Sequence, residues 1–134
     1  EDGYRLALGS YYGGEVPVLR DTPLLDLIAI ADCVVVYSSS AAFEAVAMAR
    51  PVIVTNLHGI AEHLPFVREG VALAATDVDS MVECIKSIFG GWSVAPETYS
   101  SFEERYHFRL DGRASERIVE VVEALASREL DADV

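Results

Sequence analysis

Residues 33–45, with the sequence CVVVYSSSAAFEA, decide the fold of this 134-residue chain. Residues 33–37 are apolar and rich in valine, which is typical of a strand covered on both faces in a parallel sheet. Three serines follow them, and the residues after the serines favour a helix. A strand, a turn of small residues and a helix N-terminus can form an anion site, because the first N–H groups of a helix lack partners within it.

Strand and helix patterns alternate along the rest of the chain. Apolar runs predict strands at residues 16–19, 33–37, 52–55 and 71–75. Apolar residues at helical spacing predict helices at residues 4–12, 23–31, 43–49, 60–67, 77–89, 102–108 and 113–127. Residues 92–101 are predicted to form a loop, and the tail over residues 128–134 to be frayed. The alternation predicts one α/β domain over residues 1–134, with a Rossmann-like parallel sheet of about four strands flanked by helices.

The ends of the predicted helices also carry recognisable signals. Asp21 or Thr22 can cap the helix that begins with Pro23 as its first residue. Asp77 or Asp79 can cap the helix over residues 77–89, and two glycines close that helix.

The three serines are the strongest candidate for a ligand site. Ligands in such sheets bind at the carboxyl ends of the strands, which here are residues 37–40, 55–59 and 75–77. Ser38, Ser39 and Ser40, with the N–H groups of the two alanines that follow, can receive a phosphate. The alternative is that a serine only caps the helix, as serine does at many helix starts without a ligand.

Three further residues near this edge could take part. Glu44 lies about one turn beyond the serines and can accept hydrogen bonds from ribose hydroxyls, or it can simply favour the helix dipole or complete a capping box. His58 can contact a phosphate or a base, and Gly59 lets the backbone approach a ligand. The alternative for these two is a tight loop with an exposed imidazole. His63 and His107 are predicted to be surface or packing residues.

Charge and cysteine content exclude several classes of partner. The formal net charge is −12, from 22 acidic and 10 basic residues, so binding to nucleic acid or to an anionic membrane surface is not expected. Lys86 is the only lysine, a bias expected of a halophilic protein or of a GC-rich genome. Cys33 and Cys84 are predicted to be small buried hydrophobes in a reducing compartment, the cytoplasm.

Motifs for metal, nucleophile and membrane insertion are absent from the sequence. The cysteines and histidines lack metal-binding spacing, and no Walker, GxGxxG or catalytic-triad signature occurs, so no catalytic residue can be assigned. The longest apolar run is broken by Asp26 and Asp32, short of the roughly 18 to 20 residues of a membrane span. Residues 1–3, EDG, are neither a start methionine nor a signal peptide, and they suggest a chain that begins within a longer protein.

Three segments resemble the C-terminal nucleotide-binding domain of GT-B fold enzymes. They are residues 26–45, which include DLIAIADCVVVYSSS and FEA, residues 50–54, RPVIV, and residues 110–118, LDGRASERI, which is similar to a "DG.ASERI" ending frequent in this group. The likeness spans about residues 21–125. The nearest relatives it suggests are UDP-N-acetylglucosamine 2-epimerase-like and capsule or teichoic-acid transferase-like proteins.

The resemblance implies the donor half of a two-domain enzyme that holds a nucleotide sugar, UDP-linked by family analogy, in the cleft between its domains. By match to the family motif, Ser39 and Ser40 would contact phosphate, Glu44 the ribose, and His58 and Gly59 would line the cleft. No further cofactor or metal is implied. The partner would be an N-terminal domain that this chain lacks, and without it the fragment is expected to be inactive.

The chain also departs from the family pattern. Epimerases of this kind carry a "DSGG" element followed by paired glutamates, whereas this chain has residues 37–40, YSSS, and a single Glu44. This favours a transferase-like relative. The strands that should precede residue 16 are missing, so either a rearranged sheet or pairing between molecules, as in a homo-oligomer, is expected. The alternative function is a non-catalytic α/β self-association domain in which the serines only cap a helix.

Overall fold

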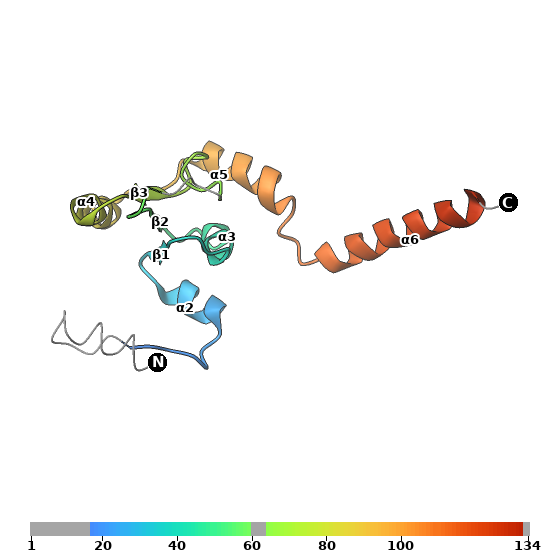
Figure 1. Ribbon diagram of the computed structural model, residues 1–134, viewed down its shortest axis with the longest axis horizontal. Coiled ribbons are helices and arrows are strands. Elements are labelled where there is room, and N and C mark those ends of the chain that lie inside the picture. The colour runs from blue at the N-terminus through green and yellow to red at the C-terminus, as the bar shows by residue number, and fades with distance from the viewer. Residues whose placement is uncertain (1–16, 60–63, 133–134) are drawn as a thin grey trace.

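A three-stranded parallel sheet forms the centre of the structure, a computed structural model that describes residues 17–59 and 64–132 (Figure 1). The strands are β1 (Val34–Val36), β2 (Val52–Thr55) and β3 (Leu73–Ala75), in the order β1-β2-β3. Both pairings are parallel, with Val36 opposite Val54 and Thr55 opposite Ala75. The predicted α/β architecture with a parallel sheet is therefore confirmed.

The sheet differs from the predicted one in strand number. Three strands are present in the described ranges, where about four were predicted. The prediction of a strand over residues 16–19 is wrong for residues 17–19. These residues have no regular structure and do not pair with any strand of the sheet. Pro17 lacks the N–H group that a ladder needs, which disfavours a strand there.

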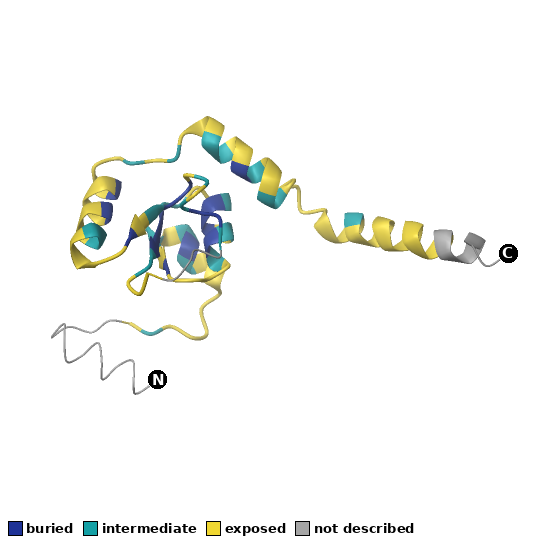
Figure 2. Ribbon diagram, turned by 45° about the horizontal axis from the view of Figure 1, so that its top comes forward, coloured by how far each residue is buried: buried dark blue, intermediate teal, exposed yellow. Residues whose placement is uncertain are grey.

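The two faces of the sheet are covered by different helices. On one face, Val36, Val52 and Val54 pack in a core with α3 (Ala41–Ala47) and with Ile28 of α2 (Leu24–Ile30). On the other face, Ile53 and Ala75 pack against Cys84 and Ile88 of α4 (Val78–Phe89). Figure 2 shows the buried residues concentrated on the strands and on the helix surfaces that face them.

Burial of β1 was predicted incorrectly. Residues 33–37 were expected to be covered on both faces, yet Val35 and Tyr37 are each 49% exposed. Val35 lies opposite Ile53, on the face that α4 covers, but α4 packs over β3 and β2 and leaves the edge strand open. The central strand β2 fits the prediction, because Val52 and Ile53 are fully buried. The free thiol of Cys84 is also buried, as expected, and burial raises its pKa, whereas Cys33 is only half-buried.

Helix boundaries follow their capping signals closely in one case and less closely in others. Asp77 caps α4 as predicted, and Gly90 is the C-cap that follows its last residue, Phe89. Pro23 is the N-cap of α2 rather than its first residue, and neither Asp21 nor Thr22 provides a side-chain cap. α3 begins two residues earlier than expected, at Ala41.

The segment after α4 was also predicted incorrectly. Residues 92–101 were expected to be a loop, but α5 (Pro96–Phe102) begins at Pro96, a residue well suited to the first position of a helix. A π-helical segment, η1 (Glu103–His107), continues it. Residues 64–67 form turns rather than the helix predicted for 60–67. The predicted helix at 4–12 and His63 lie outside the described residues.

Aromatic rings attach α5 and η1 to the sheet domain. Phe43 of α3 contacts the ring of Phe66 at a centroid distance of 4.6 Å, and Phe102 contacts Tyr106 at 4.6 Å. His107 packs edge-on against Phe43 and Phe102, which confirms its expected packing role. Phe102, at the start of the predicted aromatic helix over residues 102–108, is therefore part of the core, whereas Phe108 at its end is 61% exposed.

The last helix, α6 (Ala114–Ala132), projects away from the sheet domain (Figure 1). Its predicted apolar face is exposed, since Ile118, Val119, Val122 and Leu125 are 53–64% accessible (Figure 2). α6 continues to Ala132, five residues beyond the predicted end of the helix at residue 127.

Candidate functional site

The carboxyl ends of β1 and β2 lie side by side. Val36 pairs with Val54 in the parallel ladder, so the chain leaves both strands at the same edge of the sheet. The hydroxyl of Thr55 donates a hydrogen bond across this edge to the carbonyl oxygen of Val36, at 3.2 Å. The serines after β1 and the loop after β2 therefore start from fixed neighbouring positions.

The three serines are all exposed, and they differ in what their side chains do. Ser39 Oγ accepts a hydrogen bond from the N–H of Ala41 at 3.2 Å, which is the capping role considered as the alternative. Ser40 is the N-cap by position, but its helical backbone (φ −64°, ψ −17°) leaves its side chain without a cap hydrogen bond. The hydroxyls of Ser38 and Ser40 make no hydrogen bond to the described part of the chain.

The N–H groups expected to bind phosphate are already used. Ala41 donates to Ser39 Oγ, and Ala42 donates to the Ser39 carbonyl oxygen at 3.3 Å. Phe43 likewise donates to the Ser40 carbonyl oxygen at 2.8 Å. These N–H groups have acceptors in this conformation, whereas the hydroxyls of Ser38 and Ser40 are donors without a partner in the described structure.

Glu44 lies in the first turn of α3 and is exposed. A capping box with a serine was one expected role, but no such box forms, and no ion pair or hydrogen bond of its carboxylate occurs within residues 17–59 and 64–132. Glu44 therefore presents a carboxylate to solvent one turn beyond the serines.

His58 and Gly59 end an exposed turn that follows β2. Gly59 donates to the carbonyl oxygen of Asn56 at 3.3 Å, and its φ of 63° is readily adopted by glycine. Asn56 in turn donates its N–H to the carbonyl oxygen of Ala75, at 2.8 Å, which links this turn to the end of β3. No hydrogen bond joins His58 to the serines or Glu44 in the described structure; they share a sheet edge rather than a direct contact.

Residues 75–77, the third strand end at which a ligand was expected, serve to cap helix α4. Asp77 accepts from the N–H of Ser80 at 2.7 Å, while Ser80 Oγ accepts from the N–H of Asp77 at 3.0 Å, forming a reciprocal capping box. The N–H and the hydroxyl of Ser80 both donate to Oδ1 of Asp77, each at 2.7 Å, and these two hydrogen bonds lower the pKa of the Asp77 carboxyl group. The carboxylate of Asp77 is therefore occupied in capping α4.

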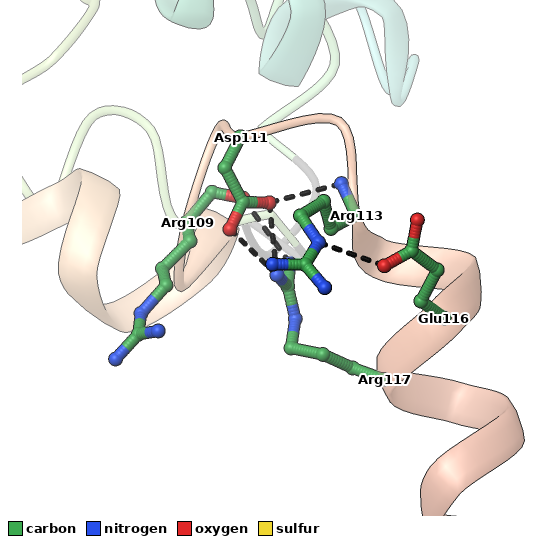
Figure 3. Close-up of polar contacts among 5 residues, drawn as sticks. All are labelled: Arg109, Asp111, Arg113, Glu116 and Arg117. Atoms are coloured by element: carbon green, nitrogen blue, oxygen red, sulfur yellow. Dashed lines mark hydrogen bonds and ion pairs between the residues drawn. The ribbon is translucent and has the colours of Figure 1, made fainter.

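An arginine-rich turn between η1 and α6 was not assigned a role from the residues themselves. Asp111 accepts two hydrogen bonds from Nη1 of Arg117, each 2.8 Å, and one from the N–H of Arg113 (Figure 3). The hydrogen bond from Arg117 is the main reason that the pKa of Asp111 is lowered. Arg113 Nε donates to Glu116 at 2.7 Å, and the guanidinium groups of Arg109 and Arg117 lie over the ring of Phe108.

This turn contains the "DG.ASERI" segment. The spacing of Asp111 six residues before Arg117 was the one sequence signal from which their ion pair could have been predicted. Because its carboxylates and two of its arginines pair with each other, the turn is built as an ion-pair cluster that fixes the start of α6.

Metal and membrane sites have no support in the described ranges. No group of three potential metal ligands is found there, and Cys33 and Cys84 are both free. Within the same residues, no helix is long and apolar enough to cross a membrane.

Comparison with known proteins gives no match to a protein-family model, to a curated protein or to a solved structure.

Proposed function

We propose that the carboxyl edge of the sheet binds a nucleotide sugar, and that the chain is the donor-binding half of a GT-B-like glycosyltransferase or UDP-N-acetylglucosamine 2-epimerase-like enzyme. The observation that carries the proposal is the pair of exposed hydroxyls of Ser38 and Ser40, without protein partners in the described structure, at the carboxyl end of β1. Parallel α/β sheets bind ligands at this edge.

The chemistry of the edge suits the two parts of such a ligand. Serine hydroxyls donate hydrogen bonds to phosphate oxygens, and the exposed carboxylate of Glu44 accepts hydrogen bonds from ribose hydroxyls. His58, in the neighbouring turn, contacts the phosphate or the base. In a transferase, hydrogen bonds to the departing phosphate stabilise the charge that develops as the bond to the anomeric carbon breaks.

The proposal assigns catalysis to two domains together. The chain supplies donor contacts, and a second domain of the same protein supplies the catalytic base and the acceptor site. Nucleotide binding without turnover is therefore expected of this chain alone. The proposal also places the protein in the cytoplasm, and its free thiols support that placement.

Calorimetric titration with UDP, UDP-N-acetylglucosamine and CDP tests the proposal, at low and at high salt. We expect saturable binding of a uridine ligand that Ser38→Ala combined with Ser40→Ala weakens at least tenfold. These hydroxyls form no hydrogen bond within residues 17–59 and 64–132, so alanine should leave the fold intact. Ser127→Ala, on the remote helix α6, is the matched control. Absence of binding, or equal binding by the double variant, would overturn the proposal.

A second candidate function is self-association without catalysis, and the exposed apolar face of α6 favours it. Ile118, Val122 and Leu125 lie on that face, each more than half exposed. A two-fold axis would place the same residues of two copies against each other. Light scattering after size exclusion should then show a dimer that Val122→Glu converts to a monomer and Val78→Glu, an exposed position on α4, does not. A monomeric chain would exclude this candidate.

A further inference from the structure

A cavity of about 300 Å³ lies at the opposite edge of the sheet from the serines. Pro51 and Val71, which precede β2 and β3, form its base, so it opens at the amino ends of these strands. The end of α3 and the start of α5 form its sides. A volume of this size is at the lower end of the range for small-molecule sites.

The walls of the cavity are mostly apolar and are held in place by a hydrogen bond. Trp92, Val94 and Tyr99 line it on the side of α5. The hydroxyl of Tyr99 donates to the carbonyl oxygen of Ala47 at 3.1 Å, which joins α5 to the end of α3. Burial raises the pKa of the Tyr99 hydroxyl, so this group remains a neutral donor.

Arg50 is the one charged residue among the described residues that line the cavity, and no aspartate or glutamate is among them. One of its terminal nitrogens, Nη2, donates to the carbonyl oxygen of Ala29. Its Nε–H group is buried and has no acceptor in the described part of the chain, and its guanidinium forms no ion pair there. A buried donor without a partner is unfavourable, and a charged one more so.

The backbone conformation of Ala49 helps to place Arg50 at the cavity. Ala49 adopts the left-handed conformation, with φ of 52°, and so ends α3. The N–H of Arg50 then donates to the carbonyl oxygen of Ala45 at 2.9 Å. In a protein with a net charge of −12, an arginine at an apolar cavity that has no carboxylate partner among the described residues is an unusual arrangement.

We propose that this cavity binds a small molecule with an apolar or aromatic body and one carboxylate group. The carboxylate accepts a hydrogen bond from a terminal N–H of Arg50 that is not used by Ala29, and the charge of the guanidinium strengthens this hydrogen bond. The apolar body packs against Trp92, Val94 and Tyr99. This site is separate from the nucleotide edge, because the two lie at opposite ends of the strands.

Trp92 allows a direct test, because it is the only tryptophan in the chain and it lines the cavity. Its fluorescence is followed during titration with 4-phenylbutyrate, and with the neutral amide 4-phenylbutyramide as the matched ligand control. We expect a saturable change with the carboxylate and at least tenfold weaker binding of the amide. Equal binding of acid and amide, or no saturable change with the acid, would contradict the proposal.

Two variants test the charge of Arg50 and the space of the cavity separately. Arg50→Gln should weaken 4-phenylbutyrate binding at least tenfold while leaving amide binding unchanged. Ser100→Phe should reduce binding of both ligands by filling the space, and it leaves Arg50 in place if Arg50→Gln fails to fold. Undiminished acid binding by either folded variant counts against the site. A uridine nucleotide should bind Arg50→Gln as it binds the parent chain, so failure of one proposal is distinguishable from failure of the other.

Discussion

Thr55 and Val36 join the carboxyl ends of the two strands that carry the candidate site, through a 3.2 Å hydrogen bond from the Thr55 hydroxyl to the Val36 carbonyl oxygen. Thr55→Val keeps the shape of the side chain and removes the donor. We expect a loss of about 1 kcal/mol in the free energy of unfolding, the usual net value of one hydrogen bond. Urea denaturation measures it, with Thr76→Val, an exposed threonine after β3, as the control. Equal stability of both variants would show that this hydrogen bond contributes nothing.

Phe102 is the centre of the aromatic cluster between α5 and α3. It is 1% exposed and contacts Phe66 and Tyr106. Phe102→Ala should cost about 3–5 kcal/mol, because it leaves a cavity in a packed core. Phe89→Ala, at a position that is 71% exposed, should change the free energy of unfolding by less than about 0.5 kcal/mol. Chemical denaturation of both variants checks this, and similar losses would mean that α5 is not packed as described.

Ala49 holds a backbone conformation that suits glycine. With φ of 52°, it ends α3 in the left-handed region. Ala49→Gly should raise the free energy of unfolding by about 0.5–1 kcal/mol, since relief of strain outweighs the greater freedom of glycine in the unfolded chain. Differential scanning calorimetry would show a higher midpoint for Ala49→Gly. A lower midpoint would mean that Ala49 is not strained.

Asp111 makes stability depend on pH in a defined direction. Its pKa in the folded protein is below the ordinary value of 3.8, chiefly because Arg117 hydrogen bonds to its charged form. The unfolded chain therefore binds this proton more readily, and the stabilisation is present above about pH 4 and is lost as pH falls through the folded pKa. Asp111→Asn should destabilise the protein at pH 7 and have a much smaller effect well below pH 3.8.

Thermal unfolding of the parent chain and Asp111→Asn over this pH range measures the difference. Glu120→Gln removes an exposed carboxylate of α6 and serves as the control for net charge. A difference between parent and Asp111→Asn that does not change with pH would mean that the ion pair with Arg117 does not contribute to stability.

The parts of the fold that sequence predicted correctly are those set by local signals. Asp77 at the start of α4 and Gly90 at its end were readable because capping and helix termination depend on neighbouring residues. The valines of β2 identified a buried central strand for a similar reason. Pro96 was mistaken for a loop residue because proline is favourable both in loops and at the first helical position, and only tertiary packing separates the two.

Long-range features of the candidate sites were not predictable in the same way. Val35 is exposed because α4 covers the other two strands, which no local pattern specifies. Similarly, Arg50 and Trp92 come together at the cavity from positions far apart in the sequence. The serines were found by their position after a strand, but whether Ser39 or Ser40 caps α3 depended on backbone angles that sequence does not give.

The central place of β2 implies an order in which the molecule opens. Its residues Val52 and Ile53 are fully buried, and it is the described strand with hydrogen-bonded neighbours on both sides. Its amide protons should therefore exchange with deuterium only when the whole domain unfolds, whereas those of α6, whose side chains are exposed, should exchange through local fraying. Amide exchange followed by mass spectrometry should consequently label α6 first and β2 last.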